Sequence, residues 1–286
     1  GGHGSQDYGA IECSGPYEFA KNARLNLIAG CDQIKVGMTG GLEGAHEGLC
    51  DRQVTNEEIE SVIWVAHNAG KKVCAHLSDD QTIFDAVSRG LDSVEHGYAM
   101  KERTVKLLKE KGAFYNPTLA VSSEDSIDYM NKHGFPAKNF AKAAWARDGH
   151  WAAARMAHDY GVKVCVGTDM VPSDPVKRGC TATQLEMELL VEHAGFTPLE
   201  VLHAATEVGA ELCDVQNITG TLKPGMEADL CIVKGCPDKS VYDMRNIEMV
   251  VKGGGIIFSN IPGHKERNFG IVAEGHIAEG GTFGNW

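Results

Sequence analysis

The sequence predicts an α/β fold in which parallel strands alternate with helices. Short apolar runs alternate with amphipathic segments along most of the chain, and glycines follow several of the amphipathic segments. Elements that alternate at this pace imply parallel strands joined by right-handed crossovers. Two architectures fit the pattern, a doubly wound sheet and a (β/α)8 barrel. About five strands are expected, so a barrel would need roughly three further βα units upstream.

The first two elements illustrate the local signals behind this prediction. Residues 31–37 (CDQIKVG) form a short apolar run, which predicts a strand that leads into the Gly-rich stretch MTGGLEG. Residues 55–69 carry apolar side chains at helical spacing, and Thr55 followed by Glu58 resembles a capping box. Gly70 then stands where helices commonly end.

The later elements repeat this order. Further strands are expected at residues 72–77, 93–96, 113–117 and 162–168, and further helices at residues 81–89, 103–111, 139–160, 182–194 and 198–212. Gly90, Gly112 and Gly161 follow three of these helices. We therefore expect residues 1–217 to form the strand-and-helix domain.

The pattern changes at Ile218. The stretches ITGTLKPGMEADLCIVKG and IEMVVKGGGIIF are rich in β-forming residues, with proline and glycine at the predicted turns. We expect residues 218–259 to form a small antiparallel β segment. Residues 260–286 are polar and Gly-rich, which predicts a loop or tail.

The composition excludes several classes of partner. Hydrophobic residues make up 43% of the 286 residues and charged residues 23%, close to the globular average. No apolar run reaches the roughly 18 residues that a membrane helix needs. The net charge of -12 argues against nucleic acid or an anionic membrane as the main partner.

Nine cysteines are present, and none forms a C-x-x-C pair. Their odd number and their places in apolar runs, as in VCAHL and VCVGTD, predict small buried side chains instead of a disulfide framework. This usage weakly favours a reducing compartment such as the cytoplasm. The start, GGHGSQDYG, has no initiator Met and no targeting signal, so we expect it to be the interior of a longer chain and leave the localisation open.

Chemically active side chains are expected at the ends of four predicted strands. Functional groups gather at the carboxyl ends of the strands in parallel α/β proteins. The first predicted strand carries Lys35, the next two end in His76 and His96, and the last leads into Asp169. A single buried histidine is more often structural, but four strand ends with this set favour a site. Imidazole and carboxylate ligands suit Zn, Mn, Fe or Ni.

Several of these motifs resemble one known family. The runs IKVGMTGG, AHL, VEHG and VGTDM are similar to motifs of the amidohydrolase superfamily, in its imidazolonepropionase-like and Xaa-Pro or Xaa-Arg dipeptidase branch. GFTPLEVLHAATEVGAELC and GTLKPGMEADLCIV resemble the helix pair and the C-terminal β segment of that family. The resemblance covers nearly the whole chain. It implies a (β/α)8 TIM barrel, here with about five of eight strands, and part of a composite β-sandwich.

The resemblance also implies a role for each site residue. Lys35, which would be costly to bury unpaired in the run IKV, would be carboxylated and would bridge two metal ions. His76 and His96 would ligate the more exposed ion, and Asp169 the other. The ions would be divalent, with zinc favoured, and one or two would bind. A metal-activated hydroxide would attack the scissile carbonyl, and Asp169 would pass its proton to the leaving amine.

The sequence departs from the family in one respect. Members carry an H-x-H pair on the first barrel strand, and no H-x-H occurs here, where only His3 precedes Lys35. We therefore expect that the first three strands, two metal ligands and the upstream β segment of the sandwich lie outside this sequence. One ion would still be held by Lys35, His76 and His96, and a second would be bound poorly.

Three further residues are candidates for contact with a substrate. Tyr98 follows His96, Asn116 ends the fourth predicted strand, and His46 follows the strand that carries Lys35. We expect the loops at residues 120–140 and 171–183 to determine specificity. No serine-hydrolase signature and no phosphate-binding glycine pattern occurs.

Two functions from different classes remain open. The leading one is metal-dependent hydrolysis of the C–N amide bond of a dipeptide, an N-acyl amino acid or a cyclic amide. The alternative is a truncated, catalytically impaired fragment with a binding or structural role. Open strand edges also predict a homo-oligomer or association with the missing N-terminal segment.

Overall fold

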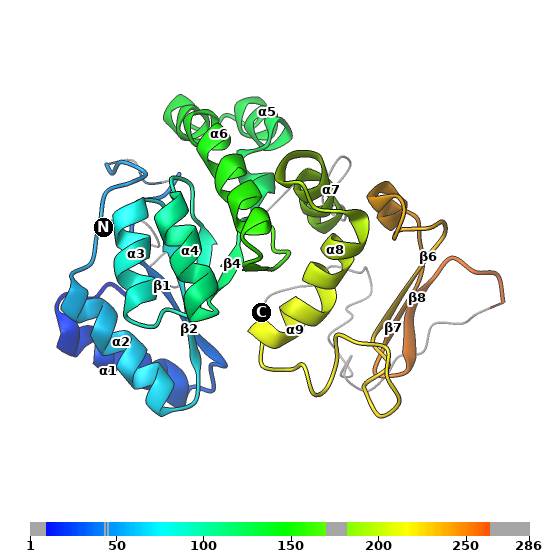
Figure 1. Ribbon diagram of the computed structural model, residues 1–286, viewed down its shortest axis with the longest axis horizontal. Coiled ribbons are helices and arrows are strands. Elements are labelled where there is room, and N and C mark those ends of the chain that lie inside the picture. Colours follow the sequence, from blue (N-terminus) through cyan, green and yellow to red (C-terminus); the bar gives the residue numbers. More distant parts are fainter. Residues whose placement is uncertain (1–9, 43, 45, 170–181, 264–286) are drawn as a thin grey trace.

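The computed structural model describes residues 10–42, 44, 46–169 and 182–263 (Figure 1). A five-stranded parallel sheet is its framework, and the strands are neighbours in the order β1-β2-β3-β4-β5. These strands are β1 (Gln33–Gly37), β2 (Lys72–Leu77), β3 (Ser93–His96), β4 (Phe114–Asn116) and β5 (Lys163–Val164). A doubly wound sheet reverses its strand order at a switch point. The unbroken order is therefore that of an arc of a barrel, as the resemblance implies.

Helices connect the strands, and α3 and α4 lie side by side in front of the sheet in Figure 1. The helices are α1 (Pro16–Ile28), α2 (Asn56–Asn68), α3 (Asp80–Ser88), α4 (Glu102–Lys111), α5 (Glu124–Lys132), α6 (Ala137–Asp159), α7 (Ala182–Ala194), α8 (Pro198–His203) and α9 (Gly209–Leu212). Short helical turns follow β4 and α8, namely the 3-10 turn η2 (Leu119–Ser122) and the π-helical turn η4 (Ala204–Val208).

The face of the sheet that packs against the helices is apolar. One row across all five strands lies in register and belongs to the main core: Val36, Ala75, Val94, Tyr115 and Val164. Because side chains alternate along a strand, the residues between them lie on the other face. That inner face is where the barrel interior is expected.

The inner face carries the polar and titratable side chains. One of its rows contains Lys35, Cys74, Ser93 and Phe114, and the next contains Gly37, His76, Glu95 and Asn116. The second row lies nearer the carboxyl ends of the strands. The predicted strands therefore deliver His76 and its neighbours to the end of the sheet where active sites form.

Local sequence signals determine several helix ends as predicted. Thr55 and Glu58 form both hydrogen bonds of a capping box at the start of α2, and Gly70 after the helix has a φ of 67°. Gly112 ends α4 in the left-handed conformation, with a φ of 68°. The helix predicted at residues 198–212 is instead divided by the π-helical turn η4.

Three features differ from the sequence-based expectation. Helices α1 and α5 were not predicted, although Pro16 suits the first turn of α1 and Ser123 caps α5. The strand expected at residues 162–168 is reduced to β5, which pairs only with β4. Among the described residues β5 has a paired strand on one side only. Pairing on both sides would favour a longer strand.

The C-terminal segment forms a separate three-stranded antiparallel sheet, with strand order β6-β7-β8. The strands are β6 (Leu230–Val233), β7 (Ile247–Lys252) and β8 (Gly255–Ser259). This sheet lies at the opposite end of the molecule from α1 and α2 (Figure 1). In the part of the chain that the structure describes, no helix has the length and apolar character needed to span a membrane.

The cysteines of the described residues are all reduced. Cys74 and Cys165 are buried, as the runs VCAHL and VCVGTD predicted, whereas Cys31, Cys213 and Cys231 are exposed. Burial raises the pKa of the Cys74 thiol to about 11, so it stays protonated at neutral pH.

Candidate active site

Three of the four predicted site residues converge at the carboxyl ends of the strands. The rings of His76 and His96 are in edge contact, with centroids 4.6 Å apart. Asp169 lies beyond β5, and its Oδ2 is 3.8 Å from His96 Nε2. Residues from β2, β3 and the segment after β5 thus meet at one place.

His76 is held by the loop that follows β1. Its Nε2 lies 2.9 Å from the carbonyl oxygen of Gly40, and the side chain is 4% exposed. Because a carbonyl only accepts hydrogen bonds, Nε2 carries a proton and is the donor in this contact. The Gly40 amide in turn donates to the carbonyl of Asp51 at 2.9 Å, which fixes this part of the loop.

His96 ends β3 in a left-handed conformation, with a φ of 69°. Its Nδ1 lies 2.6 Å from Thr118 Oγ1, and the Tyr115 hydroxyl donates to its carbonyl oxygen at 2.7 Å. The contact at Nδ1 sets the plane of the ring and directs Nε2 toward Asp169. The ring of Tyr98 stacks on it at a centroid distance of 5.4 Å.

Asp169 also has a positive φ, of 48°, and its side chain is 57% exposed. Backbone conformations of this kind are rare for residues other than glycine, and they gather at functional sites. An exposed carboxylate beside a buried imidazole can accept a proton from a bound molecule. The geometry is therefore compatible with the acid–base role expected of Asp169.

Lys35 differs from the buried residue that the run IKV suggested. It is exposed on the inner face of β1, the edge strand of the sheet. It lines a cavity of about 570 Å³ between α1 and β1. Among the described residues no carboxylate forms an ion pair with Lys35, and exposure to water removes the need for one. Lys35 lies two residues before Gly37, the partner of His76 in the sheet.

The donor types fit a divalent metal ion, but the ligand set is incomplete. Two imidazoles and a carboxylate are ligands that zinc accepts. Within the described ranges, no three His, Cys, Asp or Glu side chains are arranged to hold an ion. An unmodified lysine is not among the usual ligands of zinc, so Lys35 would need carboxylation to join them. The described residues thus offer metal-binding donor types without a complete set of ligands.

Asn116, a predicted substrate contact, has a buried acceptor available. Its Nδ2 donates to Glu95 Oε2 at 2.7 Å, and Ser93 Oγ donates to Glu95 Oε1 at 2.6 Å. Because a carboxylate only accepts, the amide nitrogen must face Glu95. Among the described residues, Asn116 Oδ1 is buried without a hydrogen-bond partner. The structure does not test substrate contact, and Asn116 stays a candidate.

Tyr98 is buried behind the site. Its side chain is 2% exposed and packs in a small cluster with Leu42 and Leu49. Burial, and then the charge of Asp169, raise the pKa of the Tyr98 hydroxyl, so the phenol stays neutral. Its predicted contact with a substrate stays a prediction.

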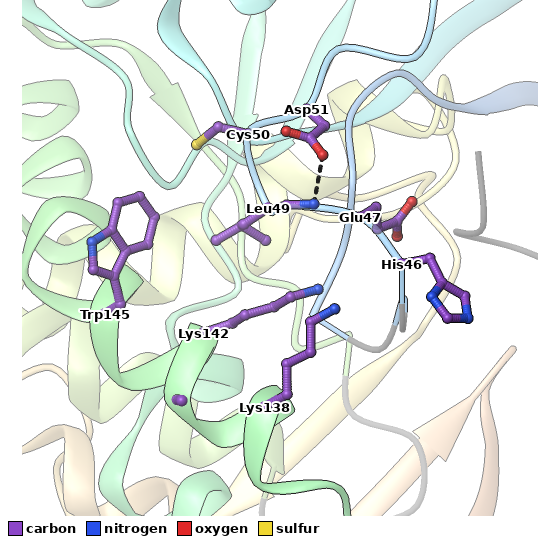
Figure 2. A pocket seen from close by; sticks show the side chains of 10 residues that line it. His46, Glu47, Leu49, Cys50, Asp51, Lys138, Lys142 and Trp145 are labelled. Carbon is purple, nitrogen blue, oxygen red and sulfur yellow. Dashed lines mark hydrogen bonds between the residues drawn. The ribbon is translucent and has the colours of Figure 1, made fainter.

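His46 lines a hollow of about 780 Å³ between the loop after β1 and helix α6 (Figure 2). Lys138 and Lys142 extend from α6 toward this loop. Lys142 Nζ donates to the carbonyls of Gly41 and Gly44, both at 2.8 Å. Burial, and then the charge of Lys138, lower the pKa of Lys142. His46 thus belongs to a loop pinned by α6, and its role stays a prediction.

Three residues around the site were not singled out by the sequence: Glu95, His150 and Glu186. Glu95 in VEHG could have been found, because it precedes His96 in the same strand. His150 and Glu186 lie inside long helices, where no local signal separates them from structural residues. Of the two loops expected to determine specificity, residues 170–181 lie outside the described residues. The other, residues 120–140, contains α5.

The chain belongs to the amidohydrolase family. The family model matches residues 5–257. This match confirms the resemblance seen in the sequence motifs, and the enzymes named among the relatives are hydrolases.

Two curated proteins and one solved structure illustrate the relationship. Ochratoxinase of Aspergillus niger is 31% identical over 244 residues, which cover 84% of this chain and 49% of that protein. An imidazolonepropionase of Geobacillus thermodenitrificans is 31% identical over 156 residues, 53% of this chain and 36% of that protein. A Xaa-Pro dipeptidase with bound methionine aligns with a TM-score of 0.81 and 28% identity, over 90% of this chain and 64% of that one. The chain spans about half the length of the ochratoxinase that it matches.

Proposed function

We propose that the protein takes part in metal-dependent hydrolysis of a C–N amide bond in a dipeptide, an N-acyl amino acid or a cyclic amide. The observation that carries this proposal is the convergence of His76, His96 and Asp169 at the carboxyl ends of the strands. The family and the hydrolases among its relatives support it. The Xaa-Pro dipeptidase among the solved structures favours a small peptide-like substrate.

The metal would be divalent, as is general in the family, and zinc is our preferred ion. His76 would offer Nδ1 and His96 would offer Nε2, since the other nitrogen of each ring has a protein partner. Lys35 would join them after carboxylation. The chemistry that a divalent ion supplies in such a site is the activation of water as a nucleophile.

The residues of this chain would then orient the substrate and move protons. Asp169 would accept the proton of the attacking water and donate it to the leaving amine, since its carboxylate is exposed at the site. Asn116 Oδ1 would accept a hydrogen bond from a substrate N–H, which would satisfy a buried acceptor. Glu95 would hold the Asn116 amide in that orientation.

The open edge of β1 indicates where further ligands would enter. In the described ranges β1 pairs only with β2, and a cavity lined by Ile34 and Val36 runs along its other side. Unpaired strand edges favour association. We propose that upstream barrel strands, or a second copy of the chain, cover this edge and complete the site.

A second candidate is a catalytically impaired chain that only binds a ligand. The incomplete set of metal donors among the described residues favours it. Metal content separates the two candidates. One or two tightly bound ions per chain would favour the enzyme, whereas a metal-free protein that hydrolyses no member of a dipeptide panel would favour the second candidate.

The exchange Asp169→Asn tests the assignment of the acid–base group. We expect turnover of dipeptides by the zinc-loaded protein to fall about 100-fold or more, because general acid–base groups contribute roughly that much. Asp214→Asn is a matched control, since Asp214 also has a positive φ, of 59°, but pairs with Lys72 away from the site. Turnover retained in Asp169→Asn would overturn the assignment.

A further inference from the structure

A buried carboxylate on α7 holds the turn that follows β4. Glu186 is 0% exposed and lies inside α7. Its Oε1 accepts a hydrogen bond from the Leu119 amide at 2.8 Å, and its Oε2 accepts one from the Ala120 amide at 2.7 Å. Both oxygens therefore bind successive backbone amides of η2.

The residue before this turn contacts the imidazole of His96. Thr118 has a φ of 57° and is 2% exposed, and its Oγ1 lies 2.6 Å from His96 Nδ1. Thr118 and His96 thus meet while both adopt the left-handed backbone region. For a β-branched residue this conformation is strained, and it persists only where surrounding contacts impose it.

A histidine of α6 also contacts the same turn. His150 Nε2 lies 2.5 Å from the carbonyl oxygen of Pro117, and its Nδ1 lies 2.9 Å from Ser122 Oγ. His150 is itself fully buried on α6. Helices α6 and α7 therefore both fix the turn, and within the described ranges it is Glu186 that binds the two amides next to Thr118.

We propose that Glu186 is a positioning residue for the active site, which orients the imidazole of His96 through Thr118. This inference rests on the proposed function, in which His96 offers Nε2 to a metal ion. Glu186 does not touch the reacting atoms. It fixes the Leu119 and Ala120 amides, these place Thr118 Oγ1, and Thr118 sets the ring plane of His96 through its contact with Nδ1.

A neighbouring glutamate supplies a matched control. Glu188 lies on the same helix and is 5% exposed, but its carboxylate binds Arg245 at 2.5 and 2.7 Å instead of the turn. Glu188→Gln removes a buried carboxylate without changing the contacts of His96. Any effect that comes only from loss of stability should appear in both variants.

The experiment measures His96 directly and does not require activity. The 15N chemical shifts of histidine side chains report which ring nitrogen carries the proton, and a His96→Gln spectrum assigns the His96 signals. Spectra of the metal-free chain are compared for Glu186→Gln, Thr118→Val, Thr118→Ser and Glu188→Gln. Zinc dissociation constants of the same proteins are then measured by competition with a chelator.

We expect Glu186→Gln and Thr118→Val to shift the His96 signals and to weaken zinc binding about 10- to 100-fold, as loss of partners around metal ligands does. The amide of Gln would direct a donor at one of the two backbone N–H groups, so it cannot replace the carboxylate. Thr118→Ser keeps the hydroxyl and should restore both readouts, and Glu188→Gln should change neither. If Glu186→Gln does not fold, Glu186→Asp applies the same test with a shorter carboxylate.

Unchanged His96 signals in a folded Glu186→Gln protein would overturn the proposal. Equal changes in Glu186→Gln and Glu188→Gln would overturn it too, because they would reflect a general loss of stability. Failure of the proposed function gives a different result. The chain would then bind no zinc in any variant, while the His96 signals of the metal-free protein would still respond to Glu186.

Discussion

The two sides of the candidate site are built differently. On the β3 and β4 side, His96 is buried and bonded to Thr118, with Tyr115, His150 and Glu186 behind it. On the β1 side, Lys35 is exposed at the edge of the sheet and has no carboxylate partner among the described residues. The His96 side is held in place by contacts within the chain, whereas the described residues provide no ion pair that would hold Lys35 in place.

The two sides therefore differ in how readily they would bind a metal ion. A ligand that is fixed by its neighbours loses little entropy when an ion binds, whereas a mobile exposed lysine must be ordered first. His96 therefore has the fixed position expected of a preorganised ligand. Lys35 resembles a ligand that becomes ordered only when the edge of β1 is covered or the amine is carboxylated.

The largest expected effect compares these two residues directly. We predict that His96→Ala weakens zinc binding at least about 100-fold, or about 2.7 kcal/mol. Lys35→Ala should weaken binding by this chain less than about 10-fold, because exposed Lys35 is not preorganised. Zinc titration against a chelator checks both values. Equal losses would break the comparison and would indicate that Lys35 is already a ligand in the isolated chain.

A second prediction concerns the charge of the buried carboxylate on the β3 and β4 side. Burial raises the pKa of Glu186 from 4.5 to about 8, although the two backbone amides oppose the shift. Between these values the folded state binds a proton that the unfolded state releases, so this group makes stability fall as pH rises. Each unit of pKa difference corresponds to about 1.4 kcal/mol, and rehydration of the site would limit the loss to about 2 kcal/mol.

The measurement is the free energy of unfolding at pH 5 and pH 8, for the native sequence and for Glu186→Gln. We expect the decline toward pH 8 to be about 2 kcal/mol smaller in the variant, because Gln does not titrate. Burial lowers the pKa of His150 to about 4, so His150 has the opposite pH dependence, and the difference between the two proteins cancels it. Parallel pH profiles would show that Glu186 carries no such shift.

The sequence predicted those features that depend on nearby residues. The capping box of α2 and the left-handed glycine after α4 depend on contacts within one turn, and both were found. The alternation of strands and helices likewise placed His76, His96 and Asp169 at the carboxyl ends of the strands. Local periodicity is sufficient for such predictions because it records which face of each element is buried.

Features that depend on distant residues could not be predicted. Leu119 and Glu186 are 67 positions apart, and no pattern near either residue indicates their hydrogen bond. The exposure of Lys35 follows from its place on an edge strand, which the run IKV does not reveal. Helices α1 and α5 were missed although Pro16 and Ser123 provide local start signals, and α5 lies in a segment expected to be a loop.

The smallest expected effect concerns core packing. It compares one valine on the β1 side with one valine on the β3 side. Val36 of β1 and Val94 of β3 lie in one row of the same face, but Val36 is 8% exposed and lines the open cavity, whereas Val94 is 0% exposed. We predict that Val94→Ala costs about 2 kcal/mol of unfolding free energy and Val36→Ala about 1 kcal/mol, because a site that borders a cavity already lacks some contacts. Chemical denaturation of both variants measures the difference. If the β1 edge becomes covered in a larger assembly, Val36→Ala should then approach the cost of Val94→Ala, since the cavity beside it would be filled.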